Sequence, residues 1–161
     1  MLQIVLRFAH VFFGAMWVGM MAFQIFFLGP ALADVGADAG KLMAAMVKRK
    51  IPVFIPIFAL ITLVSGFWLF ARMSGGNAGA LMRTPMGMGF GLGGVVALLA
   101  FVIGVVVMRP AMMRSMQLAE SRDPAAQAEI QRLRARATVT GNVVTVMLFF
   151  TLTAMAVARY L

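Results

Sequence analysis

Apolar residues dominate four stretches of the chain, and shorter polar segments separate them. The stretches cover approximately residues 3–28, 51–71, 86–108 and 138–158. Each reaches the roughly 20 residues that a helix needs to cross the hydrocarbon core of a bilayer. Because the connections are short, the pattern predicts an all-α, integral membrane four-helix up-down bundle in a single transmembrane domain over residues 1–161.

The two longer connections carry helix signals of their own. Residues 31–50 are amphipathic, and we expect a short helix at the membrane surface there. Asp123 and Pro124 have the order of an N-cap and a first helical residue, so a second amphipathic helix should lead into the fourth span. We expect Pro30 and Pro110 to end the first and third spans, because proline cannot donate to the helical hydrogen-bond ladder.

Basic residues are distributed unevenly between the two sides of the expected bundle. Ten of the 14 Lys and Arg lie in the connections 30–50 and 109–137. The other four are Arg7, Arg72, Arg83 and Arg159. The positive-inside rule therefore places the longer loops in the cytoplasm of a bacterium and both termini outside the cytoplasmic (inner) membrane.

Composition excludes several classes of function. The chain is 63% hydrophobic with a mean hydropathy of +0.98, which indicates a membrane protein. With a net charge of +9 located at the ends of apolar runs, anionic lipids are the expected partner and nucleic acid is not. The sequence has no cysteine and no acidic residue inside a span, so thiolate chemistry and a carboxylate proton relay are not expected. We find no catalytic constellation.

One face of the first span carries its notable polar side chains. His10, Gly14, Trp17, Met21 and Gln24 are spaced by three or four residues, so they share one side of a helix at about 100° per residue. His10 is the single histidine of the chain. An ionisable residue inside a membrane helix is a candidate functional group, and this face should turn toward other helices or a ligand.

Candidate binding groups gather in the half of the bundle expected to face outward. One hypothesis is a haem b site in which His10 binds the iron and Met86 or Met88 supplies a second metal ligand. The other expected cofactor-binding residues are Gly14, Trp17, Trp68 and Arg72. An arginine at the membrane surface would pair with a haem propionate.

The same residues also fit a purely structural role. The glycines of the third span can be close contacts between helices, the tryptophans can pack in the bundle or at its interfaces, and His10 can be hydrogen-bonded across the bundle to Thr or Ser. A soft Cu(I) site at Met16, Met20 and Met21 is a further alternative. Methionine is, however, also ordinary filler in apolar helices.

The segment Arg7–Phe23 resembles the opening helix of a loose group of bacterial membrane proteins. This group contains the copper-resistance D family, the membrane domain of cytochrome-linked urate oxidases and the four-helix membrane protoporphyrinogen oxidases. The second span looks similar to theirs over residues 62–69, Thr-Leu-Val-Ser-Gly-Phe-Trp-Leu. In the opening helix the shared positions are His10, Gly14, Trp17 and Gly19.

The resemblance implies a four-helix membrane fold and, as in the haem-binding members, haem b held by His10. Those members usually carry further histidines or a lysine in a later helix. This chain departs from that pattern, since its lysines are all in the first loop: Lys41, Lys48 and Lys50.

Three functions follow from these expectations. The leading hypothesis is an integral membrane subunit or non-catalytic binding module that holds haem b through His10. The second is a haem-dependent oxidase of the protoporphyrinogen oxidase type. The third is a structural accessory subunit of a respiratory or photosynthetic membrane complex. A larger membrane complex or a homo-oligomer is the expected protein partner.

Overall fold

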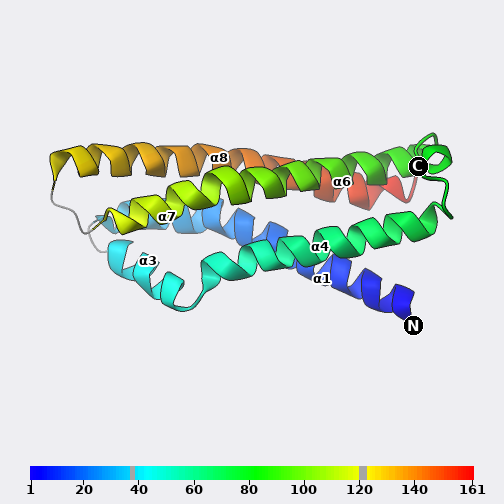
Figure 1. Ribbon diagram of the computed structural model, residues 1–161, viewed down its shortest axis with the longest axis horizontal. Coiled ribbons are helices and arrows are strands. Elements are labelled where there is room, and N and C mark those ends of the chain that lie inside the picture. The colour runs from blue at the N-terminus through cyan, green and yellow to red at the C-terminus, as the bar shows by residue number, and fades with distance from the viewer. Residues whose placement is uncertain (37–38, 120–122) are drawn as a thin grey trace.

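Four long helical segments run side by side along the long axis of the protein (Figure 1). The computed structural model describes residues 1–36, 39–119 and 123–161, and no strand occurs among them. Each segment is long and apolar enough to cross a membrane, so the predicted all-α four-helix bundle is confirmed and fits a multi-pass membrane protein. The segments are Leu2–Asp34, Ile51–Met73, Pro85–Gln117 and Pro124–Ala158.

The first and third segments both contain a π-helical turn that ends two residues before a proline. Helix α1 (Leu2–Phe23) passes through η1 (Gln24–Leu28) into α2 (Gly29–Asp34), and α2 contains Pro30. Helix α6 (Pro85–Ile103) likewise passes through η3 (Gly104–Met108) into α7 (Arg109–Gln117), with Pro110 as its second residue.

These π-turns correct the expected helix ends. The Gly29 N–H donates to the Gln24 carbonyl, and the Arg109 N–H donates to the Gly104 carbonyl, each five residues back. The wider turn accommodates a proline ring that would clash with a carbonyl four residues back in an α-helix. The prediction that Pro30 and Pro110 end their helices is therefore wrong, and both helices continue beyond the predicted spans.

Shorter elements connect the long helices. Helix α3 (Ala39–Lys48) leads into α4 (Ile51–Met73), and the one-turn helix α5 (Ala78–Leu81) lies between α4 and α6. Helix α8 (Pro124–Ala158) begins as predicted, with the Asp123 carboxylate accepting from the Ala125 N–H at 3.0 Å. Arg122, counted above among the loop charges, lies outside the described residues.

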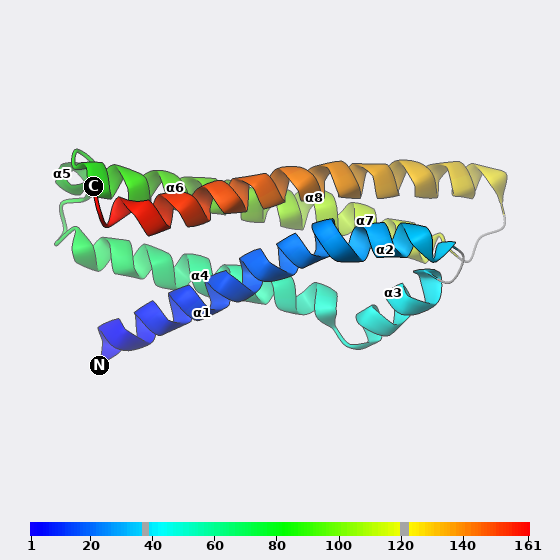
Figure 2. The ribbon, with the colours of Figure 1, turned by 180° about the vertical axis from the view of Figure 1, so that it is seen from behind.

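The bundle consists of two antiparallel hairpins. Helix α1 packs mainly on α4, and α6 packs mainly on α8. Both termini lie at the same end of the bundle, as an even number of passes requires (Figure 2). Between the hairpins lies a core of buried side chains: Trp17, Met21, Ala59, Ala97, Ala100, Met108, Val144 and Leu148.

The glycine face of α6 serves the contact with α8. A Cβ on Gly89 would lie 2.6 Å from the Cβ of Ala158, and one on Gly93 would lie 3.2 Å from Met155. The Thr151 hydroxyl donates to the Gly93 carbonyl at 3.2 Å. These positions are occupied by another helix, so the close-packing interpretation of the glycines applies to them.

Candidate functional site

His10 is fixed against α4 by a hydrogen bond to the main chain. Its Nδ1 lies 2.9 Å from the carbonyl oxygen of Thr62, and because a carbonyl can only accept, Nδ1 is the donor. In the neutral ring this leaves the lone pair on Nε2, for which no hydrogen bond is present in the described part of the chain. A histidine that binds a metal usually donates its other N–H in this way, to a carbonyl or carboxylate.

The hydroxyl groups on the α4 face are already satisfied within their own helix. Thr62 Oγ1 donates to the Phe58 carbonyl at 2.7 Å, and Ser65 Oγ donates to the Ile61 carbonyl at 2.6 Å. Both residues are buried. In the structural alternative we expected His10 to be hydrogen-bonded to Thr or Ser across the bundle. The imidazole does bond to Thr62, but to its backbone carbonyl and not to a hydroxyl.

Two glycines allow α1 and α4 to approach at this contact. A Cβ on Gly66 would lie 2.6 Å from Cε1 and 2.8 Å from Nδ1 of His10, so the imidazole occupies the space that a side chain at Gly66 would need. A Cβ on Gly14 would lie 3.3 Å from the Thr62 methyl group. His10, Gly14, Thr62 and Gly66 therefore form one tight contact, which we call the outer contact.

The other candidate residues that we expected in the same half of the bundle are not gathered around His10. Trp68 follows Gly66 by two residues, leaves α4 on another face and is 50% exposed. Arg72 is also exposed. Met86 and Met88 lie on α6, and both ribbon views show the N-terminal end of α1 beyond α4 as seen from α6 (Figures 1 and 2).

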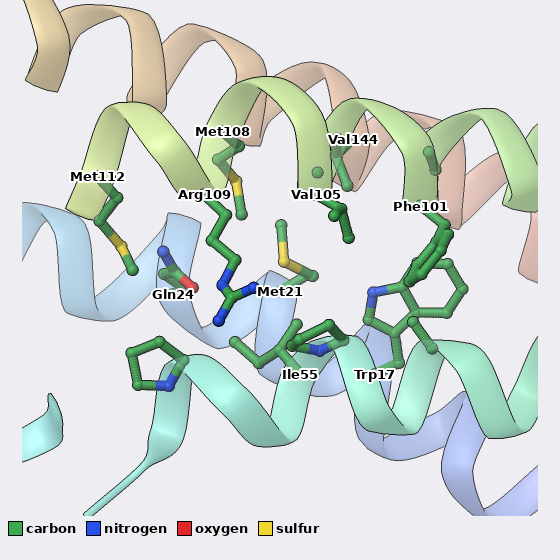
Figure 3. A pocket seen from close by; sticks show the side chains of 15 residues that line it. Trp17, Met21, Gln24, Ile55, Phe101, Val105, Met108, Arg109, Met112 and Val144 are labelled. Carbon is green, nitrogen blue, oxygen red and sulfur yellow. The ribbon is translucent and has the colours of Figure 1, made fainter. Parts of the chain in front are cut away.

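Trp17 belongs to a different place in the bundle. It is 3% exposed and its ring meets Phe101 edge-on, with 6.5 Å between the centroids. It lies at one end of a partly open cavity of about 50 Å³ between the two hairpins, where a single water needs roughly 10–15 Å³ (Figure 3). We call this space the inner cavity, because it lies in the half of the bundle assigned above to the cytoplasmic side.

Besides the indole N–H of Trp17, the inner cavity has mostly apolar walls and two strongly polar side chains. The apolar lining comes from all four long segments and includes Met21, Ile55, Phe101, Val105, Met108, Met112 and Val144. The polar residues are Gln24, at the start of η1, and Arg109, directly after η3. Figure 3 shows the Arg109 side chain extending from its helix toward α4, beside Gln24.

Arg109 has no acceptor for its buried nitrogen. Its Nε is buried without a hydrogen-bond partner among the described residues, and no carboxylate in that part of the chain forms an ion pair with it. The sequence places Arg109 only at the end of a span and so misses this site. The one available signal is the Arg-Pro pair, which becomes informative once the helix is known to continue through it.

Metal sites built from several ionisable side chains are not found in the residues the structure describes, which contain no group of three or more His, Cys, Asp or Glu. A metal centre at His10 would therefore depend on Nε2 together with ligands other than a cluster of His, Cys, Asp or Glu side chains. Comparisons with family models, with curated proteins and with solved structures give no match to this chain.

Proposed function

We propose that the protein is a non-catalytic membrane binding module that holds haem b through His10 Nε2. The observation that supports this proposal is the 2.9 Å hydrogen bond from Nδ1 to the Thr62 carbonyl. The bond orients the ring, selects the tautomer and leaves Nε2 available to a metal. Haem b would supply redox or ligand-binding chemistry, and the role of this chain is to position one imidazole inside the membrane.

The donor set fits a haem with one ligand from each chain. Met86 and Met88 lie on a helix that is separated from the N-terminal end of α1, so in the described part of the chain they do not adjoin His10. A further haem ligand could be supplied by His10 of a second copy. This arrangement agrees with a homo-oligomer or a larger complex as partner.

The experiment compares visible spectra of the purified protein in mild detergent. Wild type is expected to show a Soret band, which His10→Ala abolishes and Gly94→Ala retains. Gly94 is the control, because it lies in another membrane helix, outside the positions of the resemblance, and nothing lies within 4 Å of a Cβ placed there. A folded, colourless wild type, prepared from haem-replete cells, would refute the proposal.

An activity assay on the same sample distinguishes the binding module from the oxidase alternative. Added to membranes deficient in porphyrinogen oxidation, the haem-loaded protein is expected to restore no activity, because the described part of the chain offers no acid–base group beside His10. Restored activity that His10→Ala removes would establish the enzyme instead.

We further propose that the protein lies in the bacterial cytoplasmic membrane with both termini outside. The ten basic residues in the two longer connections support this orientation. A reporter enzyme fused after Leu161 is expected to be active only on the external side. Cytoplasmic activity would reverse the orientation.

A further inference from the structure

Arg109 is a half-buried cation between apolar helices, and its buried Nε has no acceptor among the described residues. A guanidinium carries five N–H donors and no acceptor, and it stays protonated in proteins. Leaving a buried charged donor unsatisfied costs several times more than leaving a neutral one. A ligand that carries negative charge and hydrogen-bond acceptors into the inner cavity would therefore satisfy Arg109.

The cavity itself indicates what kind of group would fit. Its walls are apolar along most of their length, and its polar groups are the amide of Gln24, the guanidinium of Arg109 and, at the other end, the indole N–H of Trp17. A planar guanidinium binds phosphate or carboxylate oxygens through two parallel hydrogen bonds. A ligand with one anionic head and an apolar remainder matches this combination.

The position of the cavity places that head near a membrane surface. The lining residues of α4 run from Pro52 to Ala59, which is the first 12 Å or so of that helix. Helix α4 is 23 residues long, so it spans about 35 Å and little more than the bilayer core. Its first turn therefore lies at the interface.

Further basic residues surround this end of the bundle. Lys48, Arg49 and Lys50 directly precede α4, and Arg114 lies one helical turn beyond Pro110 in α7. The described acidic residues at this end are Asp34 at the end of α2, Asp123 before α8 and Glu129 in α8, and they are fewer than the basic ones. The local field favours an anion, and basic pockets between membrane helices are known to hold anionic lipid head groups.

We propose that the inner cavity is a binding site for an anionic phospholipid. Its phosphate is held by the Arg109 guanidinium and the Gln24 amide, and the upper part of one acyl chain lies along the apolar wall between α4 and η3. This site is separate from the outer contact and does not depend on haem at His10. The phosphate chemistry could also be met by a free anion, but the apolar walls favour the lipid.

The first test measures lipid affinity in a neutral detergent. Phosphatidylglycerol is titrated into wild type, Arg109→Gln and Arg114→Gln, and bound lipid is counted by native mass spectrometry. Arg114 is the matched control, because it is an exposed arginine on the same helix. We expect Arg109→Gln to bind about 10-fold more weakly and Arg114→Gln to stay within about 2-fold of wild type.

A second measurement reports whether the lipid enters the cavity. The chain has two tryptophans, so Trp68→Phe leaves Trp17, which lines the cavity, as the one fluorophore of its kind. Phosphatidylglycerol with brominated acyl chains is expected to quench Trp17 more than brominated phosphatidylcholine, and Arg109→Gln should abolish the difference. In Trp17→Phe the half-exposed Trp68 should be quenched equally by both lipids.

Three outcomes would overturn the proposal. The first is equal affinity of wild type and Arg109→Gln for phosphatidylglycerol. The second is equal quenching of Trp17 by the anionic and zwitterionic lipids. The third is competition by inorganic phosphate at the same concentration as the lipid, since this would show that a free anion fills the site.

Discussion

The outer contact and the inner cavity differ in whether the protein itself provides a hydrogen-bond partner for the polar side chain. At the outer contact His10 donates to the Thr62 carbonyl, and Gly66 leaves the imidazole no spare room. At the inner cavity the Nε of Arg109 has no partner within the described chain, and about 50 Å³ of space adjoins it. At the outer contact the Nδ1 side of the imidazole has its hydrogen-bond partner, whereas at the inner cavity there is room for a partner that the described chain does not supply.

The difference shows which polar groups the bundle satisfies by itself. A membrane offers no water to a buried donor, so an unsatisfied group there is costly and persists only where something else supplies the partner. For His10 the partner of Nδ1 is already present in α4. For Arg109 it must come from outside the described chain, and this is why the inner cavity carries the stronger inference about a ligand.

The largest expected effect comes from filling the space under the imidazole. Gly66→Ala places a Cβ within 3 Å of His10 and should displace the ring from Thr62. We expect a loss of about 2 kcal/mol in the free energy of unfolding, as for other overpacked sites. The measurement is unfolding in mixed detergent micelles followed by circular dichroism.

Gly94→Ala is the control for this change. It is the same substitution in another membrane helix, where nothing lies within 4 Å of the new Cβ. Its effect should stay within about 0.5 kcal/mol. A Gly66→Ala protein as stable as the control would mean that the outer contact is looser than the structure shows.

At the inner cavity we expect a substitution to leave the stability unchanged or to raise it. Arg109→Gln removes a half-buried charge whose Nε lacks an acceptor in the described chain, so in detergent without anionic lipid the variant should be as stable as wild type or more stable, by about 1 kcal/mol. Thermal denaturation in neutral detergent measures this. A clear loss of stability would show that Arg109 already has a partner within the protein and would remove the contrast between the two sites.

The smallest effect is expected for Gln24→Leu. Hydrogen bonds between membrane helices contribute about 0.6 kcal/mol on average, and no hydrogen bond of the Gln24 side chain is present in the described chain. Stability should therefore change by less than about 0.6 kcal/mol, while phosphatidylglycerol affinity falls about 3-fold. Unchanged affinity would assign lipid binding to Arg109 alone.

Of the two polar sites, the sequence predicts the one at His10 but not the one at Arg109. His10 is recognisable in the sequence because a single imidazole inside an apolar run is unusual, and its helix face follows from spacing alone. Arg109 is not recognisable, because arginine followed by proline ordinarily marks the end of a span. Its position inside the bundle depends on η3 and on the continuation of the helix to Gln117.

The sequence by itself determined the four apolar helices, their up-down order and the start of α8 at Asp123 and Pro124, since length, hydropathy and capping are local properties. Only the tertiary structure decided the partners of the polar side chains. It set His10 against the Thr62 backbone, filled the Gly89–Gly93 face with α8 and gave Arg109 an apolar cavity. The physical reason is that lipid-facing and helix-facing surfaces are equally apolar, so pairing between helices is decided by close packing and individual hydrogen bonds, which residue patterns do not record.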